Sequence, residues 1–261
     1  MKGRIPLSGT ENKLPAADDR PGGLAILTGS GMEALVDSLG AKFGLDACVS
    51  FDEIPGLGGC TVEGHRGEIK QGIHPGNGTR LAVVSGRRHL YEGGDSTMAP
   101  MIEWLKSREY RSLVTISAAG GVSNGIESGE LVVIQEIIDL QNRPRLYPRG
   151  GGPVRYFPTR SLTKALEKAA GRARRPVIRG TLACSAGPAY ETPAEVRALQ
   201  VMDADVATMS AAPEAQFALS VGMEVAIIAA VTNKGTGIGR ELLDHASVVG
   251  VARSMCDALA D

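Results

Sequence analysis

Short apolar runs alternate along this chain with segments whose apolar residues recur every three or four positions. The runs are nearly continuous, which is typical of strands that are buried on both faces. They lie at residues 24–28, 80–85, 113–117, 131–138, 180–185, 205–208 and 224–231. Amphipathic or capped segments between and after them predict helices that begin near residues 32, 98, 161, 192, 213 and 245. Strands that alternate with helices predict an α/β fold.

Length and composition indicate one domain. A chain of 261 residues is long enough to bury a substantial core in a single α/β domain. Residues 1–23 are polar and rich in Pro, Gly and Asp, so we expect an N-terminal arm followed by a domain over residues 24–261. For that domain we expect a three-layer α/β/α arrangement with a mixed, twisted central sheet. Residues 139–157 are rich in Arg, Pro and Gly, which predicts a mobile loop.

Two of the predicted helices carry specific signals. Thr192 and Glu195 have the spacing of a capping box, and Pro193 stands at the first helical position, which favours a helix start at this point. The C-terminal segment is expected to form one helix, because four apolar residues recur at helical spacing and would share a face. These residues are Val248, Ala252, Met255 and Leu259.

Polar residues gather where three of the later strands end. Tyr190 and Glu191 follow the strand over 180–185 after a Gly-Pro turn, and Met209 and Ser210 follow the next strand. Asn233 comes directly after the third strand. Because open α/β sheets bind ligands at the carboxyl ends of their strands, this pattern predicts a binding site. Glu191 and Asn233 also have simpler interpretations: Glu191 as an acid that complements a helix dipole, and Asn233 as a polar turn residue.

Two earlier strands end in residues that suit an anion. Ser30 lies between two glycines after the first strand, where backbone N–H groups, a hydroxyl and a helix start come together. Alone, that pattern fits an ordinary tight turn better, and it is neither a Walker A nor a dinucleotide motif. Arg87 and His89 follow the strand over 80–85 at alternate positions, so they would share one face of an extended segment. A guanidinium fork beside an imidazole suits a tetrahedral oxyanion, although an isolated Arg-x-His is more often a solvated edge.

Charge and cysteine usage narrow the class of protein further. The formal net charge is −1 and hydrophobic residues make up 43% of the chain, so we expect neither nucleic acid nor an anionic membrane as a partner. The longest purely apolar run, residues 225–231, is too short to span a bilayer, and the first twenty residues contain no signal-peptide core. Four scattered cysteines without a Cys-x-x-Cys pair predict reduced thiols, no metal site and a cytoplasmic location.

Several segments resemble signatures of the trimeric purine nucleoside phosphorylases. The most specific is GPAYETPAE at residues 187–195, which is followed at compatible spacing by Met-Ser and Thr-Asn pairs. SGRRHLYEG at residues 85–93 resembles the family's GRxHxYEG motif, and residues 117–121 resemble its Asn-Ala-Ala-Gly-Gly motif, with Ser117 where Asn is usual. Three of the four histidines, His65, His89 and His245, fall at family motif positions.

The resemblance implies a role for each matching residue. Inorganic phosphate, the co-substrate, would be held by Ser30, His65, Arg87, Ala118 and Ser210. The sugar would be lined by Tyr91, His89, Met209 and His245. The purine would be bound by Tyr190, Glu191 and Asn233. Catalysis would depend on Asn233, Glu191, His89 and His245, without a metal ion or cofactor, in a homotrimer.

The implied chemistry is phosphorolysis of a nucleoside. Bound phosphate would act as nucleophile and counter-charge to an oxocarbenium-like sugar, so no protein nucleophile is required. An ionised Glu191 favours bases that offer hydrogen-bond donors, as the N1–H group of 6-oxopurines does. Adenine presents an acceptor at N1, a mismatch that can cost roughly 10⁴-fold in a buried site. We therefore expect cleavage of inosine and guanosine, or their deoxy forms, to free base and pentose 1-phosphate.

Two alternatives remain open at this stage. Ser117 and the unusual segment over 139–157 also fit a nucleoside-binding or regulatory protein that kept the fold and lost efficient catalysis. A second alternative is a phosphorylase of methylthioadenosine or methylthioinosine, although relatives with that activity carry aspartates around the base-binding positions.

Overall fold

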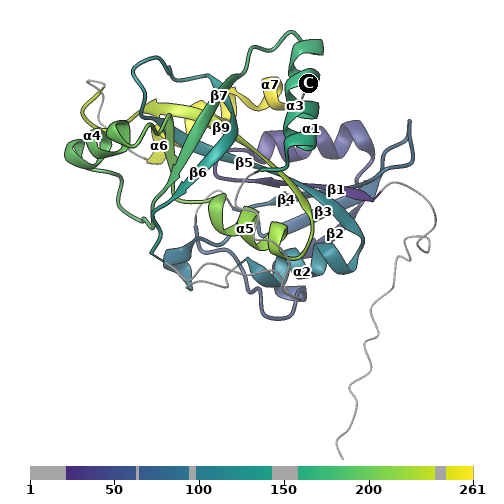
Figure 1. Ribbon diagram of the computed structural model, residues 1–261. Coiled ribbons are helices and arrows are strands. Elements are labelled where there is room, and N and C mark those ends of the chain that lie inside the picture. Colours follow the sequence, from purple (N-terminus) through teal and green to yellow (C-terminus); the bar gives the residue numbers. More distant parts are fainter. Residues whose placement is uncertain (1–21, 63–64, 94–97, 143–157, 239–244, 261) are drawn as a thin grey trace, which may run out of the picture.

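A nine-stranded mixed sheet forms the centre of the computed structural model, which describes residues 22–62, 65–93, 98–142, 158–238 and 245–260 (Figure 1). The strands are β1 (Gly23–Thr28), β2 (Ala47–Ser50), β3 (Glu68–Ile73), β4 (Arg80–Ser85), β5 (Tyr110–Gly121), β6 (Leu131–Asp139), β7 (Ile178–Cys184), β8 (Val206–Thr208) and β9 (Glu224–Lys234). The helices are α1 (Glu33–Phe43), α2 (Ala99–Ser107), α3 (Arg160–Arg172), α4 (Pro193–Val201), α5 (Ala212–Ser220), α6 (His245–Ser254) and α7 (Cys256–Ala260), with short 3₁₀ turns at Phe51–Glu53 and Leu90–Glu92.

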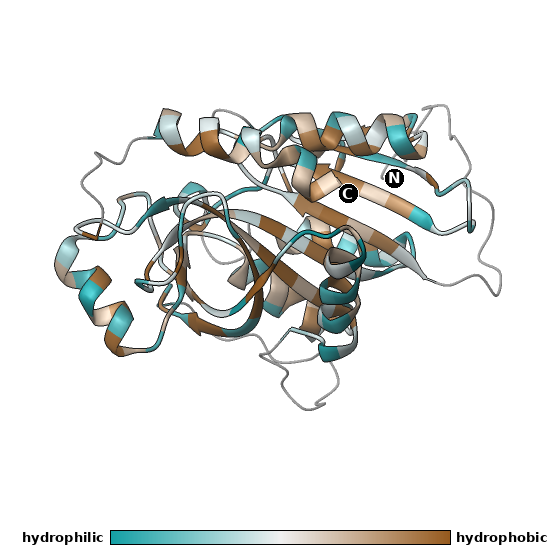
Figure 2. Cartoon of the chain, turned by 90° about the horizontal axis from the view of Figure 1, so that it is seen from above, coloured by the Kyte–Doolittle hydropathy of each residue, from teal (hydrophilic) through white to brown (hydrophobic). Residues whose placement is uncertain are grey.

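Helices cover both faces of this sheet, as expected for a three-layer α/β/α fold. In β1, Ala25 and Leu27 pack into the cluster that contains Met101 of α2, whereas Ile26 packs into the cluster that contains Leu35 of α1. This alternation follows the strand's period of two residues. Figure 1 shows α1, α3 and α7 on one side of the strands and α2 and α5 on the other. Hydrophobic strands fill the interior in Figure 2, and hydrophilic segments lie mostly on the peripheral helices.

The second half of the sheet closes on itself. β5 pairs with β1, β8 and β9, and the chain of neighbours β8–β7–β6–β9 returns to β5. Strands β5 to β9 therefore form a ring, while β1 to β4 extend from it as an open sheet. The pairing of β5 with β9 shifts register between Ala119 and Gly120, and this irregularity places Asn233 opposite Gly120. Such irregularities commonly re-aim side chains beside binding sites.

Most predicted strands are present, and the differences have local causes. The strand over 80–85 matches β4, whereas the strand expected at 113–117 extends over Tyr110–Gly121 because its small residues continue to pair with β8 and β9. β2 and β3 were not among the predicted strands: they pair antiparallel at the sheet edge and include polar, partly exposed residues, so they lack a continuous apolar run. The arm predicted over 1–23 lies outside the described residues except for Gly22 and Gly23, and Gly23 already begins β1. The loop predicted over 139–157 lies largely outside them too.

The expectation of a single C-terminal helix is wrong. The segment forms α6 and α7, which meet at Met255. There the amide of Met255 donates to both Val251 O and Ala252 O, so the last turn of α6 tightens before α7 begins. Val248, Ala252 and Met255 are nonetheless buried, as their shared face predicted.

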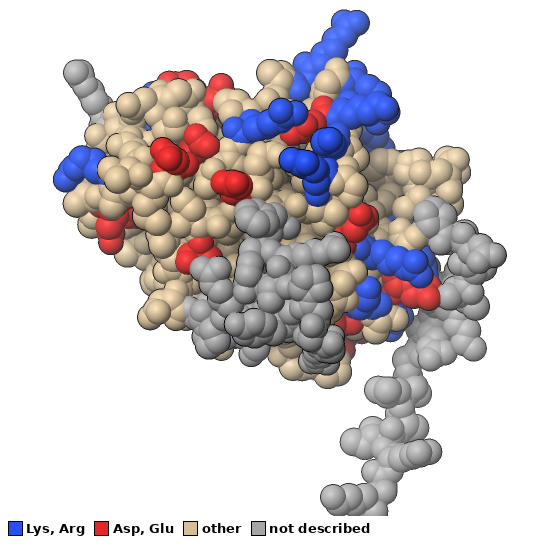
Figure 3. Space-filling model, viewed as in Figure 1, with Lys and Arg blue, Asp and Glu red and all other residues tan. Residues whose placement is uncertain are grey.

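The surface carries charges of both signs. On the face seen in Figure 3, basic and acidic side chains are interspersed, and Lys and Arg gather toward the end where α3 lies. Among the described residues, no helix combines the length and apolarity that crossing a bilayer requires.

The capping box at the start of α4 is confirmed and leads to a stability prediction. Thr192 Oγ1 accepts a hydrogen bond from Glu195 N at 3.3 Å, and Glu195 Oε2 accepts one from Thr192 N at 2.7 Å. We expect Thr192→Ala to lower the free energy of unfolding by about 1 kcal/mol, since one of the helix's free N–H groups loses its acceptor. Urea denaturation followed by circular dichroism measures this change. An unchanged midpoint would show that the box contributes nothing to stability.

Candidate active site

One pocket lies where strands from both parts of the sheet end. Its walls come from the turns after β1 and β4, the last residues of β5 and β9, the segments after β7 and β8, and the start of α6. The pocket opens to solvent, and the space between its walls, including that opening, is about 860 Å³.

All twelve predicted site residues converge on this pocket. Eleven of them line it: Ser30, Arg87, His89, Tyr91, Ala118, Tyr190, Glu191, Met209, Ser210, Asn233 and His245. The twelfth, His65, lies behind Ser30, with its Nε2 atom 3.0 Å from Ser30 Oγ. Residues up to 215 positions apart in the sequence (Ser30 and His245) thus share one cavity. Their individual roles remain predictions.

His65 connects the turn after β1 to the turn after β4. Its Nδ1 atom lies 2.9 Å from Arg87 O, and its Nε2 atom faces Ser30 Oγ. When Nδ1 carries the proton and donates to Arg87 O, Nε2 accepts from the Ser30 hydroxyl. Burial lowers the pKa of His65 to about 4, and the nearby charges of Arg87 and His89 act in the same direction. The imidazole is therefore neutral near pH 7.

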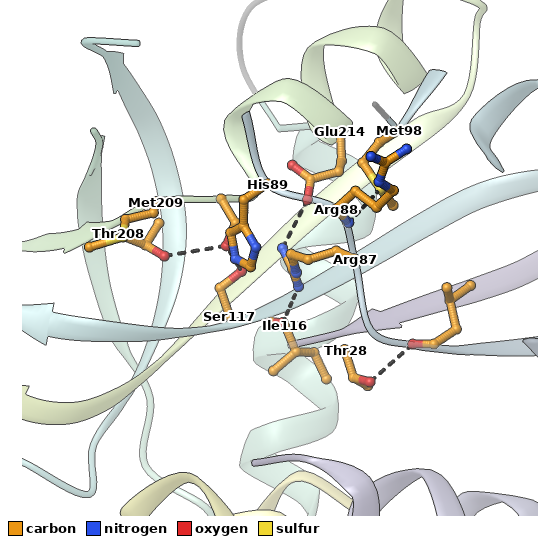
Figure 4. A network of polar contacts seen from close by, with 12 residues as sticks. Thr28, Arg87, Arg88, His89, Met98, Ile116, Ser117, Thr208, Met209 and Glu214 are labelled. Carbon is orange, nitrogen blue, oxygen red and sulfur yellow. Dashed lines mark hydrogen bonds and ion pairs between the residues drawn. The ribbon is translucent and has the colours of Figure 1, made fainter. Parts of the chain in front are cut away.

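Arg87 is fully buried, and one edge of its guanidinium group is directed at the turn after β1. Nη1 donates to Glu214 Oε1 at 3.0 Å and Nη2 donates to Ile116 O at 2.6 Å (Figure 4). Nε is buried and has no hydrogen-bond partner. A Cβ atom built on Gly29 would lie 3.5 Å from Nη2 and 3.6 Å from Nε, so this edge faces the Gly29–Ser30 turn. An unpaired buried donor beside a hydroxyl and a helix start is an arrangement that suits an oxyanion.

Three rings, those of His65, His89 and Tyr91, stack in a row that begins beside Arg87. The ring centroids of His65 and His89 are 5.4 Å apart, and those of His89 and Tyr91 are 5.0 Å apart, with nearly parallel planes. His89 Nδ1 lies 3.0 Å from Glu92 Oε2. Burial and the positive charge of Arg87 lower the pKa of His89 despite the nearby carboxylate. Burial would raise the pKa of Glu92, but hydrogen bonds from His89 and Thr61 outweigh it and lower that pKa.

The lining of the pocket also includes a carboxylate and an amide. Glu191 Oε1 accepts a hydrogen bond from Ser185 Oγ at 2.7 Å. Asn233 Oδ1 accepts from Thr232 Oγ1 at 2.8 Å, and Asn233 Nδ2 donates to Lys234 O at 2.9 Å. These contacts fix both side chains and leave the second carboxylate oxygen and the second amide N–H available to a ligand.

Close approach of backbone segments shapes the parts of the pocket that Met209 and Asn233 line. Gly187 has a φ of 65°, and a Cβ atom there would lie 2.6 Å from Met209 Sδ. The positive φ favours glycine, and the missing side chain lets the segment that carries Tyr190 and Glu191 lie against Met209 without displacing it. The approach at Gly120 is also close, since a Cβ atom there would lie 3.1 Å from Asn233 Nδ2.

Several residues that hold the site together could not be predicted from the sequence. Glu214, in the first turn of α5, pairs with Arg87, although from sequence it is an ordinary helix N-terminal acid. Gln141 is buried, and its Nε2 atom donates to Ser185 O at 3.0 Å and to Met209 O at 3.3 Å, which joins two walls of the pocket. A single polar residue after a strand gave no signal for this role. Within the described ranges, no group of three or more His, Cys, Asp or Glu side chains is arranged to hold a metal ion.

The chain belongs to the Phosphorylase superfamily, whose profile matches residues 24–261. It is similar to purine nucleoside phosphorylase 1 of Geobacillus stearothermophilus, with 32% identity over 87% of this chain and 83% of the relative. It is also similar to purine nucleoside phosphorylase of Mycobacterium tuberculosis, with 33% identity over 87% of this chain and 81% of that protein. Among solved structures, it resembles a Schistosoma purine nucleoside phosphorylase in complex with hypoxanthine, with a TM-score of 0.75 and 26% identity, covering 91% of this chain and 87% of the other. Schistosoma mansoni purine nucleoside phosphorylase in complex with adenosine gives a TM-score of 0.77, also with 26% identity, 91% coverage of this chain and 87% of the other.

Proposed function

We propose that this chain is a purine nucleoside phosphorylase that cleaves inosine, guanosine or their deoxy forms with inorganic phosphate. The observation that carries the proposal is the chemistry of one pocket lining, which combines an unpaired buried guanidinium N–H with a carboxylate and an amide. The edge of buried Arg87 that carries the unpaired Nε atom faces the Gly29–Ser30 turn, and Glu191 and Asn233 belong to the same lining. Phosphate would lie beside Arg87 and the purine beside Glu191 and Asn233, with the sugar between them next to His89 and Tyr91.

In the proposed reaction, a phosphate oxygen attacks C1′ of the sugar as the C1′–N9 bond breaks. The electron pair of that bond leaves with the base, which gains a proton as hydrogen phosphate loses one on forming the ester, and the products are the purine and pentose 1-phosphate. Positive charge develops on the sugar next to the phosphate, which stabilises it. Asn233 Nδ2 would donate to the O6/N7 edge, where negative charge develops, and such preorganised donors are typically a major catalytic contribution. Arg87, Ser30, Ser210 and the backbone of Ala118, with His65 behind them, would fix the nucleophile's position.

Glu191 supports a preference for 6-oxopurines. Ser185 donates to one of its oxygens, which keeps the carboxylate oriented as an acceptor toward the pocket. Hypoxanthine and guanine offer an N1–H donor there, whereas adenine offers an acceptor. We therefore expect adenosine and methylthioadenosine to be poor substrates.

A product assay tests this function. We expect purified protein to release hypoxanthine from inosine only when phosphate is present, with guanosine cleaved comparably and adenosine and methylthioadenosine much more slowly. Chromatography of the base and of ribose 1-phosphate measures both products. Release without phosphate would instead indicate a hydrolase, and tight inosine binding without release would favour a nucleoside sensor. Preferred cleavage of methylthioadenosine would overturn the assignment of the base.

The homotrimer implied by the family resemblance belongs to the same proposal. Size-exclusion chromatography with light scattering would give three times the chain mass of 27.2 kDa if it holds.

A further inference from the structure

Three buried hydroxyl groups meet beside the end of the pocket that Arg87 occupies. Ser210 Oγ lies 3.2 Å from Ser117 Oγ and 3.4 Å from Thr208 Oγ1. Thr208 Oγ1 also donates to Ala118 O at 3.0 Å. Ser117 is 1% exposed and does not line the pocket, whereas Ser210 and Thr208 do. Figure 4 shows Ser117 on the strand next to Ile116, whose carbonyl accepts from Arg87.

The direction of each hydroxyl proton determines which of the three groups donates a hydrogen bond and which accepts one. Each hydroxyl donates one hydrogen bond and can accept two. The Thr208 hydroxyl donates its proton to Ala118 O. Thr208 Oγ1 can therefore only accept a hydrogen bond from Ser210. Without a ligand, the proton of Ser210 points to Ser117. If Ser210 turns its proton toward an anion, its oxygen becomes free to accept the proton of Ser117.

We propose that Ser117 is a positioning residue for a tetrahedral oxyanion: its hydroxyl donates to Ser210 Oγ when Ser210 donates to bound phosphate. This inference rests on the proposed function, because it places phosphate against Ser210. Chains of hydrogen bonds polarise one another, so a donor behind Ser210 strengthens the bond that Ser210 gives to a charged acceptor. Because Ser117 is buried, solvent water does not replace its hydroxyl as the donor to Ser210 Oγ. Ser117 thereby acts on phosphate without touching it.

The test compares Ser117→Ala with Thr115→Val. Thr115 lies on the same side of β5, two residues away, is fully buried, and has a hydroxyl without a hydrogen-bond partner. Thr115→Val therefore removes a buried hydroxyl from the same strand without touching the Ser117–Ser210 pair. We expect Ser117→Ala to raise the KM for phosphate roughly 3- to 10-fold, the range for one neutral hydrogen bond, with little change in the KM for inosine. Thr115→Val should leave both values within about 2-fold.

Titration calorimetry with inorganic phosphate gives a second readout that does not depend on turnover. The Kd for phosphate should rise by the same factor in Ser117→Ala and stay unchanged in Thr115→Val. Equal phosphate affinity in wild type and Ser117→Ala, or an equal loss in both variants, would overturn the inference. Wild-type protein that binds phosphate without cleaving inosine would contradict the proposed reaction. The comparison of the Kd for phosphate between the variants would still decide the role of Ser117. Wild-type protein that binds no phosphate would contradict both.

Discussion

Replacing Glu191 or Asn233 by Ala is expected to lower kcat/KM for inosine by roughly 10³-fold, with the protein still folded. Both side chains line the pocket and are proposed to bind the base, and each is held by a neighbouring hydroxyl, Ser185 for Glu191 and Thr232 for Asn233. Loss of Glu191 would leave N1–H of the bound base without an acceptor in a partly buried site. Loss of Asn233 would remove the donor aimed at the charge that the leaving purine gains. Steady-state assays with inosine at saturating phosphate measure both effects.

Glu195→Gln supplies the matched control for Glu191→Ala. Glu195 belongs to the same sequence segment, but it is exposed and acts only in the cap of α4. Its substitution should leave kcat/KM within about 2- to 3-fold, because Gln also serves at this capping position. Near-normal turnover in both Glu191→Ala and Asn233→Ala would remove the assignment of base binding to these two residues.

The strands and the convergence of the site were predictable because both depend on local patterns. Buried strands such as β4 and β9 appear in the sequence as apolar runs, and strand ends in α/β sheets gather at common edges. The capping box of Thr192 and Glu195 depends only on residues three apart, so its geometry also followed from the sequence.

Contacts between residues far apart in the chain could not be predicted from the sequence. Gln141 joins two walls of the pocket through backbone carbonyls of Ser185 and Met209, and backbone acceptors carry no residue signature. The closure of β5 against β9 depends on register, which no single strand specifies. Glu214 is separated from Arg87 by 127 positions in the sequence. An acidic residue in the first turn of a helix is explained by the helix dipole alone, so its position gave no reason to expect a contact with Arg87. The residues that orient the site are therefore harder to predict than those proposed to touch the substrate.

Glu214 lies on a helix whose entry is conformationally unusual. Ala211 has a φ of 74° and is fully buried, and it separates Ser210 from the first turn of α5. A sparsely populated backbone conformation with positive φ at a residue other than glycine typically costs about 1–3 kcal/mol and persists where the surroundings enforce it. This turn sends Ser210 into the pocket and Glu214 behind Arg87. The strain thus coincides with the placement of two groups at the proposed phosphate site.

The buried pair of Arg87 and Glu214 is expected to serve binding more than stability. Both side chains are almost completely inaccessible, and each keeps one unpaired polar atom, Arg87 Nε and Glu214 Oε2. The free energy needed to desolvate two charges is often as large as the free energy gained from their attraction. Replacing both partners with apolar residues can therefore be neutral or stabilising. Removing only one partner typically costs about 3–5 kcal/mol, because the other charge stays buried without a partner. We therefore expect Glu214→Leu alone to destabilise the fold by that amount.

The double variant Arg87→Met with Glu214→Leu separates the two roles. We expect its free energy of unfolding to lie close to that of the wild type, because neither charge is left unpaired in the core. Its phosphate-dependent cleavage of inosine should nevertheless fall by at least about 10²-fold, because the donor facing the Gly29–Ser30 turn is gone. Urea denaturation and steady-state kinetics on the same preparation measure both quantities. A stable double variant with normal phosphate kinetics would show that Arg87 does not bind phosphate. A double variant as unstable as Glu214→Leu would show that the ion pair itself holds the core, since the apolar pair restores volume without charge.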